Sequence, residues 1–162
     1  MKINIVTSSG KAKTMLGAFD AALVNAGIAN MNLLCLSSVI PPNTEIVFEK
    51  PEILERDFGK KLYVVMARRE TDKKEKIAAG IGWVIEKNNR FGLFVEHDGA
   101  TVDEVKNLIT DTLNGMMKSR DEYKFSEIQF AISETTNMNG ESSCVISVAT
   151  YGIDGWEDQK NA

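Results

Sequence analysis

The chain has 162 residues, of which 43% are hydrophobic, and this size and composition suit one domain with a buried core. Its formal net charge is −4, which disfavours a nucleic-acid partner because nucleic-acid-binding proteins concentrate positive charge on one face. The apolar runs are far shorter than the ~20 residues that cross a membrane, so no membrane partner is expected. Residues 1–7 predict a strand rather than a signal peptide, and the expected location is the cytoplasm.

The first part of the chain predicts a strand, a helix and a second strand. The first strand covers residues 2–8 and ends at Ser-Ser-Gly. From about residue 12 to residue 26 the apolar side chains recur at helical spacing, and Gly27 follows where a left-handed residue commonly ends a helix. The next strand, residues 31–37, is nearly continuous in its hydrophobicity, which predicts burial on both faces.

A double proline ends this second strand. Pro41 and Pro42 each fix a backbone φ angle and lack an N–H donor, so the strand stops near Ile40. Ser37 and Ser38 therefore stand at a forced turn of the chain. A serine pair in this position has two interpretations, a solvated strand end or a peptide bond that the second hydroxyl attacks.

The remaining sequence predicts more strands and one further amphipathic helix. The expected strands cover residues 62–67, 77–85, 91–96, 125–134 and 144–151. Thr101 to Glu104 has the form of a capping box, and apolar spacing continues the helix to about Lys118. Because the helices are separated by runs of strands, the pattern predicts an α+β layered sandwich with mainly antiparallel sheets.

The cysteines and the histidine do not predict a metal site. The chain has two cysteines, Cys35 and Cys144, and one histidine, His97. No CxxC spacing is present, and a structural zinc site usually needs four such ligands. Each cysteine lies inside an apolar run, so both are predicted to be reduced thiols of the core.

Four short motifs follow one another between Gly17 and Pro42. They are Ala-Phe-Asp in the helix, Asn-Ala-Gly-Ile at its end, Asn-Met-Asn-Leu in the strand and Ser-Ser-Val-Ile-Pro-Pro after it. A fifth motif, Phe-Val-Glu-His-Asp-Gly, ends at Gly99. In order and spacing these motifs resemble the family of pyruvoyl-dependent arginine decarboxylases, and the resemblance covers most of the chain.

The resemblance implies that the chain cleaves itself between Ser37 and Ser38, giving fragments of residues 1–37 and 38–162. Ser38 would become a covalent pyruvoyl group, which supplies the electron sink that decarboxylation of an amino acid requires. The implied reaction converts L-arginine to agmatine and CO₂ without a metal. The family further implies one αββα sandwich domain over residues 1–162, assembled as a trimer with the active site between neighbouring subunits.

The resemblance also assigns roles near the serine pair. Glu96 is the implied proton donor to the substrate Cα, and a carboxyl at the end of an apolar strand can be desolvated, which favours its protonated form. The alternative is that Glu96 begins a polar turn in which His97 also lies. Asn32 is the implied helper of self-processing at the Ser37 carbonyl. Its alternative is a strand-edge asparagine that bonds its own backbone.

Substrate recognition is expected on the first helix. A guanidinium presents a planar fork of donors that a carboxylate matches with two parallel hydrogen bonds, which makes Asp20 the candidate ligand. Leu16 lies one turn earlier and is the candidate contact for the methylene chain. The alternatives are an exposed helical aspartate and a plain core leucine.

Two rival functions remain open from the sequence. One is a pyruvoyl enzyme for another amino acid, although Asp20 would repel an acidic substrate. The other is a non-catalytic oligomeric relative that binds a small molecule, in which the serine pair is only a turn. Self-cleavage separates these classes, because only the enzyme would give fragments of about 4 and about 14 kDa at roughly 110 Da per residue.

Overall fold

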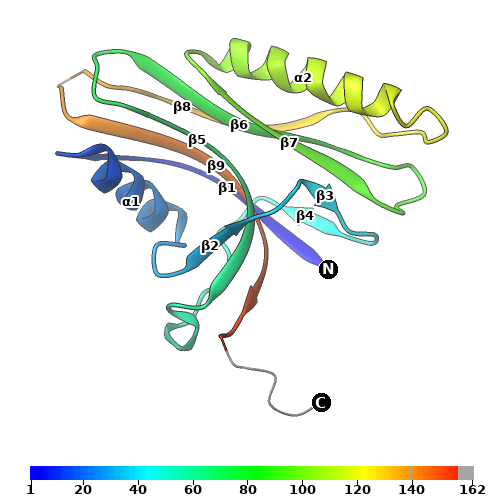
Figure 1. Ribbon diagram of the computed structural model, residues 1–162, viewed down its shortest axis with the longest axis horizontal. Coiled ribbons are helices and arrows are strands. Elements are labelled where there is room, and N and C mark those ends of the chain that lie inside the picture. Colours follow the sequence, from blue (N-terminus) through cyan, green and yellow to red (C-terminus); the bar gives the residue numbers. More distant parts are fainter. Residues whose placement is uncertain (139, 157–162) are drawn as a thin grey trace.

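The computed structural model describes residues 1–138 and 140–156 and shows two β-sheets packed face to face, with one long helix outside each sheet (Figure 1). The strands are β1 Lys2–Ala12, β2 Asn32–Cys35, β3 Val39–Ile40, β4 Glu45–Val47, β5 Lys61–Thr71, β6 Lys76–Ile85, β7 Gly92–Gly99, β8 Gln129–Thr136 and β9 Ser142–Asp154. The helices are α1 Met15–Ala26, α2 Val102–Lys118 and a short 3₁₀ helix at Glu55–Asp57.

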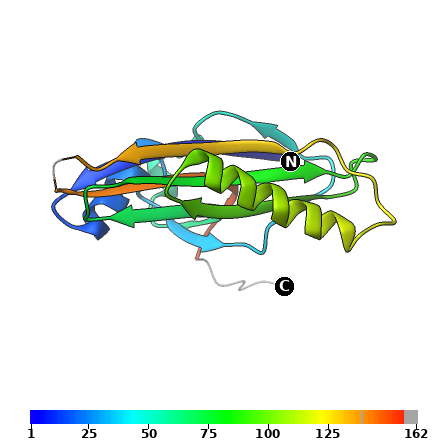
Figure 2. The same ribbon diagram turned by 90° about the horizontal axis from the view of Figure 1, so that it is seen from above.

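The strand order confirms an α+β sandwich with mainly antiparallel sheets. One sheet has the order β2-β5-β9-β1-β4 and the other has the order β3-β7-β6-β8. Parallel pairing joins β1 to β4 and β2 to β5, whereas the long central strands pair antiparallel. Seen from above in Figure 2, α2 runs across the four-stranded sheet at a distance from α1.

Three apolar cores hold the four layers together. The core between the sheets includes Ile5, Phe94 and Val145, each fully or almost fully buried. The core under α1 includes Ala18, Ala22 and Leu23, and the core under α2 includes Val105, Ile109 and Leu113. Full burial of a large apolar side chain such as Leu113 contributes about 1.5–3 kcal/mol. The αββα order follows because each helix covers the outer face of one sheet.

The helix ends agree with the sequence signals except at the start of α1. The first strand was predicted to stop at residue 8 and the helix to begin near residue 12, but β1 continues to Ala12 and α1 begins at Met15. The Thr14 side chain accepts a hydrogen bond from the Gly17 N–H (3.1 Å) and begins α1. Gly27 ends that helix with φ 81°, in the left-handed region where glycine carries no steric penalty. Thr101 caps α2 as predicted, but the Glu104 carboxylate accepts from the N–H of Ala100 instead of completing a box with the cap residue.

The prediction that the second strand is buried on both faces is wrong. β2 is an edge strand, Leu34 is 40% exposed, and Cys35 is exposed rather than part of the core. A continuous apolar run does not reveal whether a neighbouring strand covers it, because burial depends on pairing with distant residues. Cys144 is buried as predicted, and burial raises the pKa of its thiol to about 12.

Within residues 1–138 and 140–156, no helix is long and apolar enough to cross a membrane. In the same part of the chain no group of His, Cys, Asp and Glu side chains is arranged to hold a metal ion. The cytoplasmic location stays a prediction. Residues 157–162 of the predicted domain lie outside the described part.

Candidate active site

The serine pair lies where the chain crosses from one sheet to the other. β2 belongs to the five-stranded sheet and β3 to the four-stranded sheet, and Ser37 and Ser38 are in the short link between them. On one side the Leu36 N–H donates to the carbonyl of Val64 in β5 (2.9 Å). On the other side the N–H of Phe94 in β7 donates to the carbonyl of Ser38 (2.8 Å). The backbone on either side of the peptide bond between the serines is therefore held, once by each sheet.

Ser38 has a backbone conformation that is unusual for its residue type. Its φ angle is 68°, in the left-handed region. Among the described residues Asn43 and Asn89 also have positive φ, but asparagine tolerates this region in turns. A serine held there stores about 1–3 kcal/mol of conformational free energy. The strain is therefore at the peptide bond that the sequence identified as the cleavage point.

The Ser38 side chain contacts the carboxylate that the sequence assigned to proton transfer. Its hydroxyl donates to Glu96 Oε2 at 2.9 Å. Glu96 lies inside β7, because this strand continues to Gly99, which pairs with Ala78 of β6. The alternative interpretation, in which Glu96 begins a polar turn, is therefore wrong, because the backbone pairing continues through His97 and Asp98.

A pocket of about 310 Å³ opens beside this pair. Its lining residues are Ser37, Ser38, Phe94, Val95, Glu96, His97, Thr112 and Met116. The pocket follows the edge of β7, which β3 covers only at Gly92 and Leu93. His97 is part of this strand, and its Nε2 atom lies 2.8 Å from Thr112 Oγ1 of α2. The uncovered strand edge leaves room for a small molecule next to the Ser38 hydroxyl.

Asp20 and Leu16 lie together, but in another pocket. Both side chains are exposed on α1 and line a hollow of about 480 Å³ that also includes Phe19. The guanidinium of Arg68 stacks over the Phe19 ring, with its central carbon 3.5 Å from the ring centroid. This pocket shares no lining residue with the serine pocket. Within one chain the structure does not bring Asp20 to Ser38.

Asn32 is also separated from the serine pair. Its Nδ2 group donates to the carbonyl of Gly59 (2.6 Å), and its backbone N–H donates to the carbonyl of Lys60 (2.8 Å). Along an extended strand, about 16 Å of chain separate Asn32 from Ser37, at roughly 3.3 Å per residue. The side chain thus bonds to backbone of a distant segment rather than to its own backbone, and its role in self-processing stays a prediction.

Tyr151 belongs to the surroundings of the serine pair, although none of the sequence motifs includes it. Its hydroxyl donates to the carbonyl of Val39 (3.1 Å), and its ring packs against Phe94 with ring centroids 6.2 Å apart. Burial, and then the charge of Glu96, raise the pKa of the phenol above its ordinary value. The two hydrogen-bonded residues are 112 positions apart, so only tertiary structure could reveal this contact.

Comparison with known proteins gives a consistent result. The sequence model of a family described as pyruvoyl-dependent arginine decarboxylase matches residues 2–154. A relative with the same description from Halobacterium salinarum is 33% identical over 154 residues, which is 93% of this chain and 94% of that protein. One from Pyrococcus abyssi is 32% identical over 152 residues, again 93% and 94%. One from Methanococcoides burtonii is 38% identical over 105 residues, 64% of this chain and 58% of that protein.

Proposed function

Because the chain belongs to the family of pyruvoyl-dependent arginine decarboxylases, we propose that it cleaves itself between Ser37 and Ser38 and decarboxylates L-arginine to agmatine. The observation that carries this proposal is the 2.9 Å contact between the Ser38 hydroxyl and the Glu96 carboxylate, made by a serine with φ 68°. A hydroxyl next to a proton acceptor, in a strained backbone, is what attack on a neighbouring peptide carbonyl requires.

Self-cleavage proceeds in three steps. In the first, Ser38 Oγ bonds to the carbonyl carbon of Ser37, Glu96 takes the hydroxyl proton, and the peptide C–N bond breaks with a proton delivered to the nitrogen. The product is an ester of Ser37 on the Ser38 side chain, with a free amine at residue 38. In the second, loss of the Cα proton of residue 38 expels the Ser37 carboxylate and leaves a double bond. In the third, water adds at the Cα of residue 38, ammonia leaves, and a ketone remains.

The strain at Ser38 favours the first step. The left-handed φ angle costs about 1–3 kcal/mol, and breaking the C–N bond releases that free energy. The hydrogen bond from Phe94 N–H to the Ser38 carbonyl and that from Leu36 N–H to the Val64 carbonyl hold the two ends of the strained link. These bonds keep the link from relaxing before cleavage.

The pocket fits a pyruvoyl group derived from Ser38. Ser38 is half-buried and lines a hollow of about 310 Å³, which leaves one side of residue 38 accessible to a substrate. When present, the group supplies the electron sink for the carbanion that decarboxylation produces. Glu96 lies within hydrogen-bond reach of the Ser38 side chain and is the group proposed to deliver a proton to the substrate Cα. The same carboxylate thus acts as base in cleavage and as acid in turnover.

Recognition of arginine is assigned to the pocket on α1. The carboxylate of Asp20 matches the donor fork of a guanidinium, and Leu16 can pack on the methylene chain. The stacking of Arg68 on Phe19 supports the idea that this surface accommodates a guanidinium. Because the Asp20 pocket shares no residue with the serine pocket, we propose that a second copy of the chain supplies it, in a homo-oligomer that is expected to be a trimer.

Asn32 is retained in the proposal as the helper of self-processing. In its own chain the amide is bonded to the Gly59 carbonyl. A role at the Ser37 carbonyl therefore requires that this bond break, or that Ser37 of another copy approach Asn32.

Intact mass spectrometry of freshly purified protein under denaturing conditions tests the proposal. The expected result is a break after Ser37 and a second fragment that begins with a pyruvoyl-blocked residue 38. Release of CO₂ from arginine, compared with lysine and ornithine, then tests the substrate. One full-length mass would contradict the proposal and favour the non-catalytic binding protein. Cleavage with activity on another amino acid would contradict only the assignment of arginine.

A further inference from the structure

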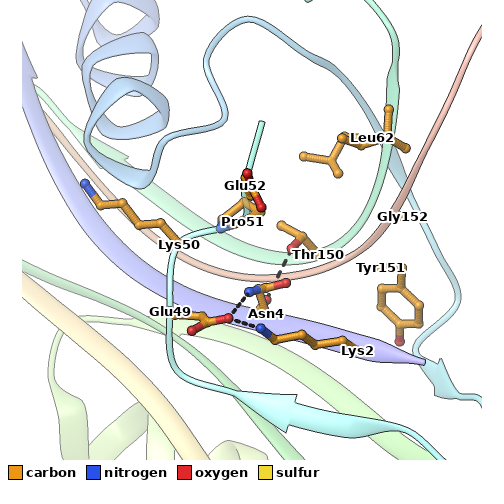
Figure 3. Close-up of a pocket in the computed structure, with 11 residues that line it drawn as sticks. Lys2, Asn4, Glu49, Lys50, Pro51, Glu52, Leu62, Thr150, Tyr151 and Gly152 are labelled. Carbon is orange, nitrogen blue, oxygen red and sulfur yellow. Dashed lines mark hydrogen bonds and ion pairs between the residues drawn. The ribbon is translucent and has the colours of Figure 1, made fainter. Parts of the chain in front are cut away.

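Tyr151 projects from β9 to the backbone that follows the serine pair. Figure 3 shows it on the wall of a pocket of about 370 Å³ that Lys2 and Gly152 also line, with its hydroxyl end directed away from Pro51 and Glu52. That hydroxyl donates to the Val39 carbonyl at 3.1 Å. Tyr151 is not among the residues that line the serine pocket.

Two consecutive carbonyls are fixed from two different sheets. The carbonyl of Ser38 accepts from the Phe94 N–H of β7, and the carbonyl of Val39 accepts from the Tyr151 hydroxyl of β9. The Tyr151 and Phe94 rings also contact each other edge to face, with an interplanar angle of 66°. Edge-to-face contact is a favourable arrangement for two aromatic rings. Together these contacts fix the chain immediately after residue 38.

The Tyr151 hydroxyl stays protonated and so keeps its ability to donate a hydrogen bond. Burial disfavours the phenolate, the negative charge of Glu96 disfavours it further, and both raise the pKa of Tyr151. The hydrogen bond to the Val39 carbonyl is therefore kept throughout the physiological pH range.

We propose that Tyr151 is a positioning residue for self-cleavage, which holds the Val39 carbonyl and so keeps Ser38 in its left-handed conformation with its hydroxyl on Glu96. The inference rests on the proposed function, because it concerns the rate at which the pyruvoyl group is made. After cleavage residue 38 has lost its backbone nitrogen, so its φ angle no longer exists. The contribution of the Tyr151 hydroxyl therefore ends with the cleavage step.

The test is the rate of cleavage in Tyr151→Phe, which removes only the hydroxyl. The chain is made in a short pulse of cell-free synthesis, and the fraction still intact is followed over time by mass spectrometry under denaturing conditions. We expect cleavage at least about 10-fold slower than in the wild type, which corresponds to about 1.4 kcal/mol in the activation free energy, because the Val39 carbonyl loses its side-chain donor. After complete cleavage, kcat for arginine per mole of pyruvoyl group should equal that of the wild type.

Tyr63→Phe is the matched control. Tyr63 also donates its hydroxyl to an oxygen, Asp154 Oδ2 at 3.4 Å, but neither residue contacts the serine pair. This variant should cleave at the wild-type rate, and the unfolding midpoints of both variants should stay within about 4 °C of the wild-type value, since each loses one hydrogen bond.

Wild-type cleavage in Tyr151→Phe would overturn the inference and leave the proposed function standing. Slow cleavage together with an equal loss of kcat per pyruvoyl group, or with a marked fall in the unfolding midpoint, would also overturn it, since Tyr151 would then support the fold in general. An uncleaved wild-type chain would overturn both the proposed function and this inference.

Discussion

The Ser38 hydroxyl donates to Glu96 Oε2 at 2.9 Å across a separation of 58 residues. One partner lies in the link between the sheets, and the other lies on the edge of β7. The strained serine and the carboxylate are therefore brought together by β3, which pairs with β7 at Gly92 and Leu93. Any change that frees this link from β7 should separate the two groups.

Glu96→Gln should slow cleavage and nearly abolish decarboxylation. The amide keeps the shape of the side chain but can neither take the Ser38 proton nor donate one to the substrate Cα. A general acid contributes about 10²- to 10⁴-fold, and we expect kcat to fall within this range. Mass spectrometry measures cleavage, and CO₂ release measures turnover. Asp98→Asn is the control, because Asp98 lies two residues further on the same strand and is bonded to Arg69; wild-type turnover in Glu96→Gln would refute the assignment.

The two serines should respond differently to replacement by alanine. Ser38→Ala removes the attacking hydroxyl and should give only the full-length mass. Ser37→Ala keeps that hydroxyl and the carbonyl that it attacks, so the chain should still cleave. Fragments in Ser38→Ala would show that another group attacks, and an intact Ser37→Ala chain would show that the first hydroxyl is also needed.

Asp20→Asn should leave cleavage unchanged and raise KM for arginine about 10-fold or more. A hydrogen bond to a charged group contributes about 1.5–3 kcal/mol, and the amide offers only one acceptor to the guanidinium. Initial rates over a range of arginine concentrations measure this change. Asp111→Asn is the control, since Asp111 is an exposed aspartate on the other long helix. An unchanged KM in Asp20→Asn would exclude Asp20 from recognition.

Glu86 should make the free energy of unfolding depend on pH in the acid range. This side chain is 1% exposed at the β6–β7 turn, and its carboxylate accepts hydrogen bonds from Asn88 and Arg90. The side-chain hydrogen bond from Arg90 lowers the pKa of Glu86 below its ordinary value of 4.5. The stabilisation is therefore complete above pH 4.5 and is lost as the pH falls through the lowered pKa.

Glu86→Gln tests this dependence. We expect the variant to be less stable than the wild type at pH 7, with a difference that shrinks as the pH falls below 4.5. Urea unfolding at a series of pH values measures the free energy of unfolding of both chains. Glu122→Gln, at an exposed position, should behave as the wild type throughout. A difference that is constant with pH would show that Glu86 acts by shape alone.

Which contacts the sequence revealed depended on their range along the chain. The end of α1 and the start of α2 were predicted because caps are made by residues within four positions of the helix end, such as Gly27 and Thr101. The turn between β6 and β7 is local in the same sense, since Asn89 has a φ angle of 57°, which asparagine tolerates. The layered α+β sandwich followed from the order of amphipathic segments, since each apolar face must be buried, whereas the αββα order came from the resemblance.

The functional motifs were also local, and for this reason the sequence alone identified Ser38, Glu96 and Asp20 as candidates. Only the tertiary structure decided which of them meet. It joined Ser38 to Glu96, left Asp20 in a separate pocket on α1, and added Tyr151 from β9. It also made β2 an edge strand. The physical reason is that strand pairing and sheet packing join residues that are distant in the chain, and no local pattern states which strands will be neighbours.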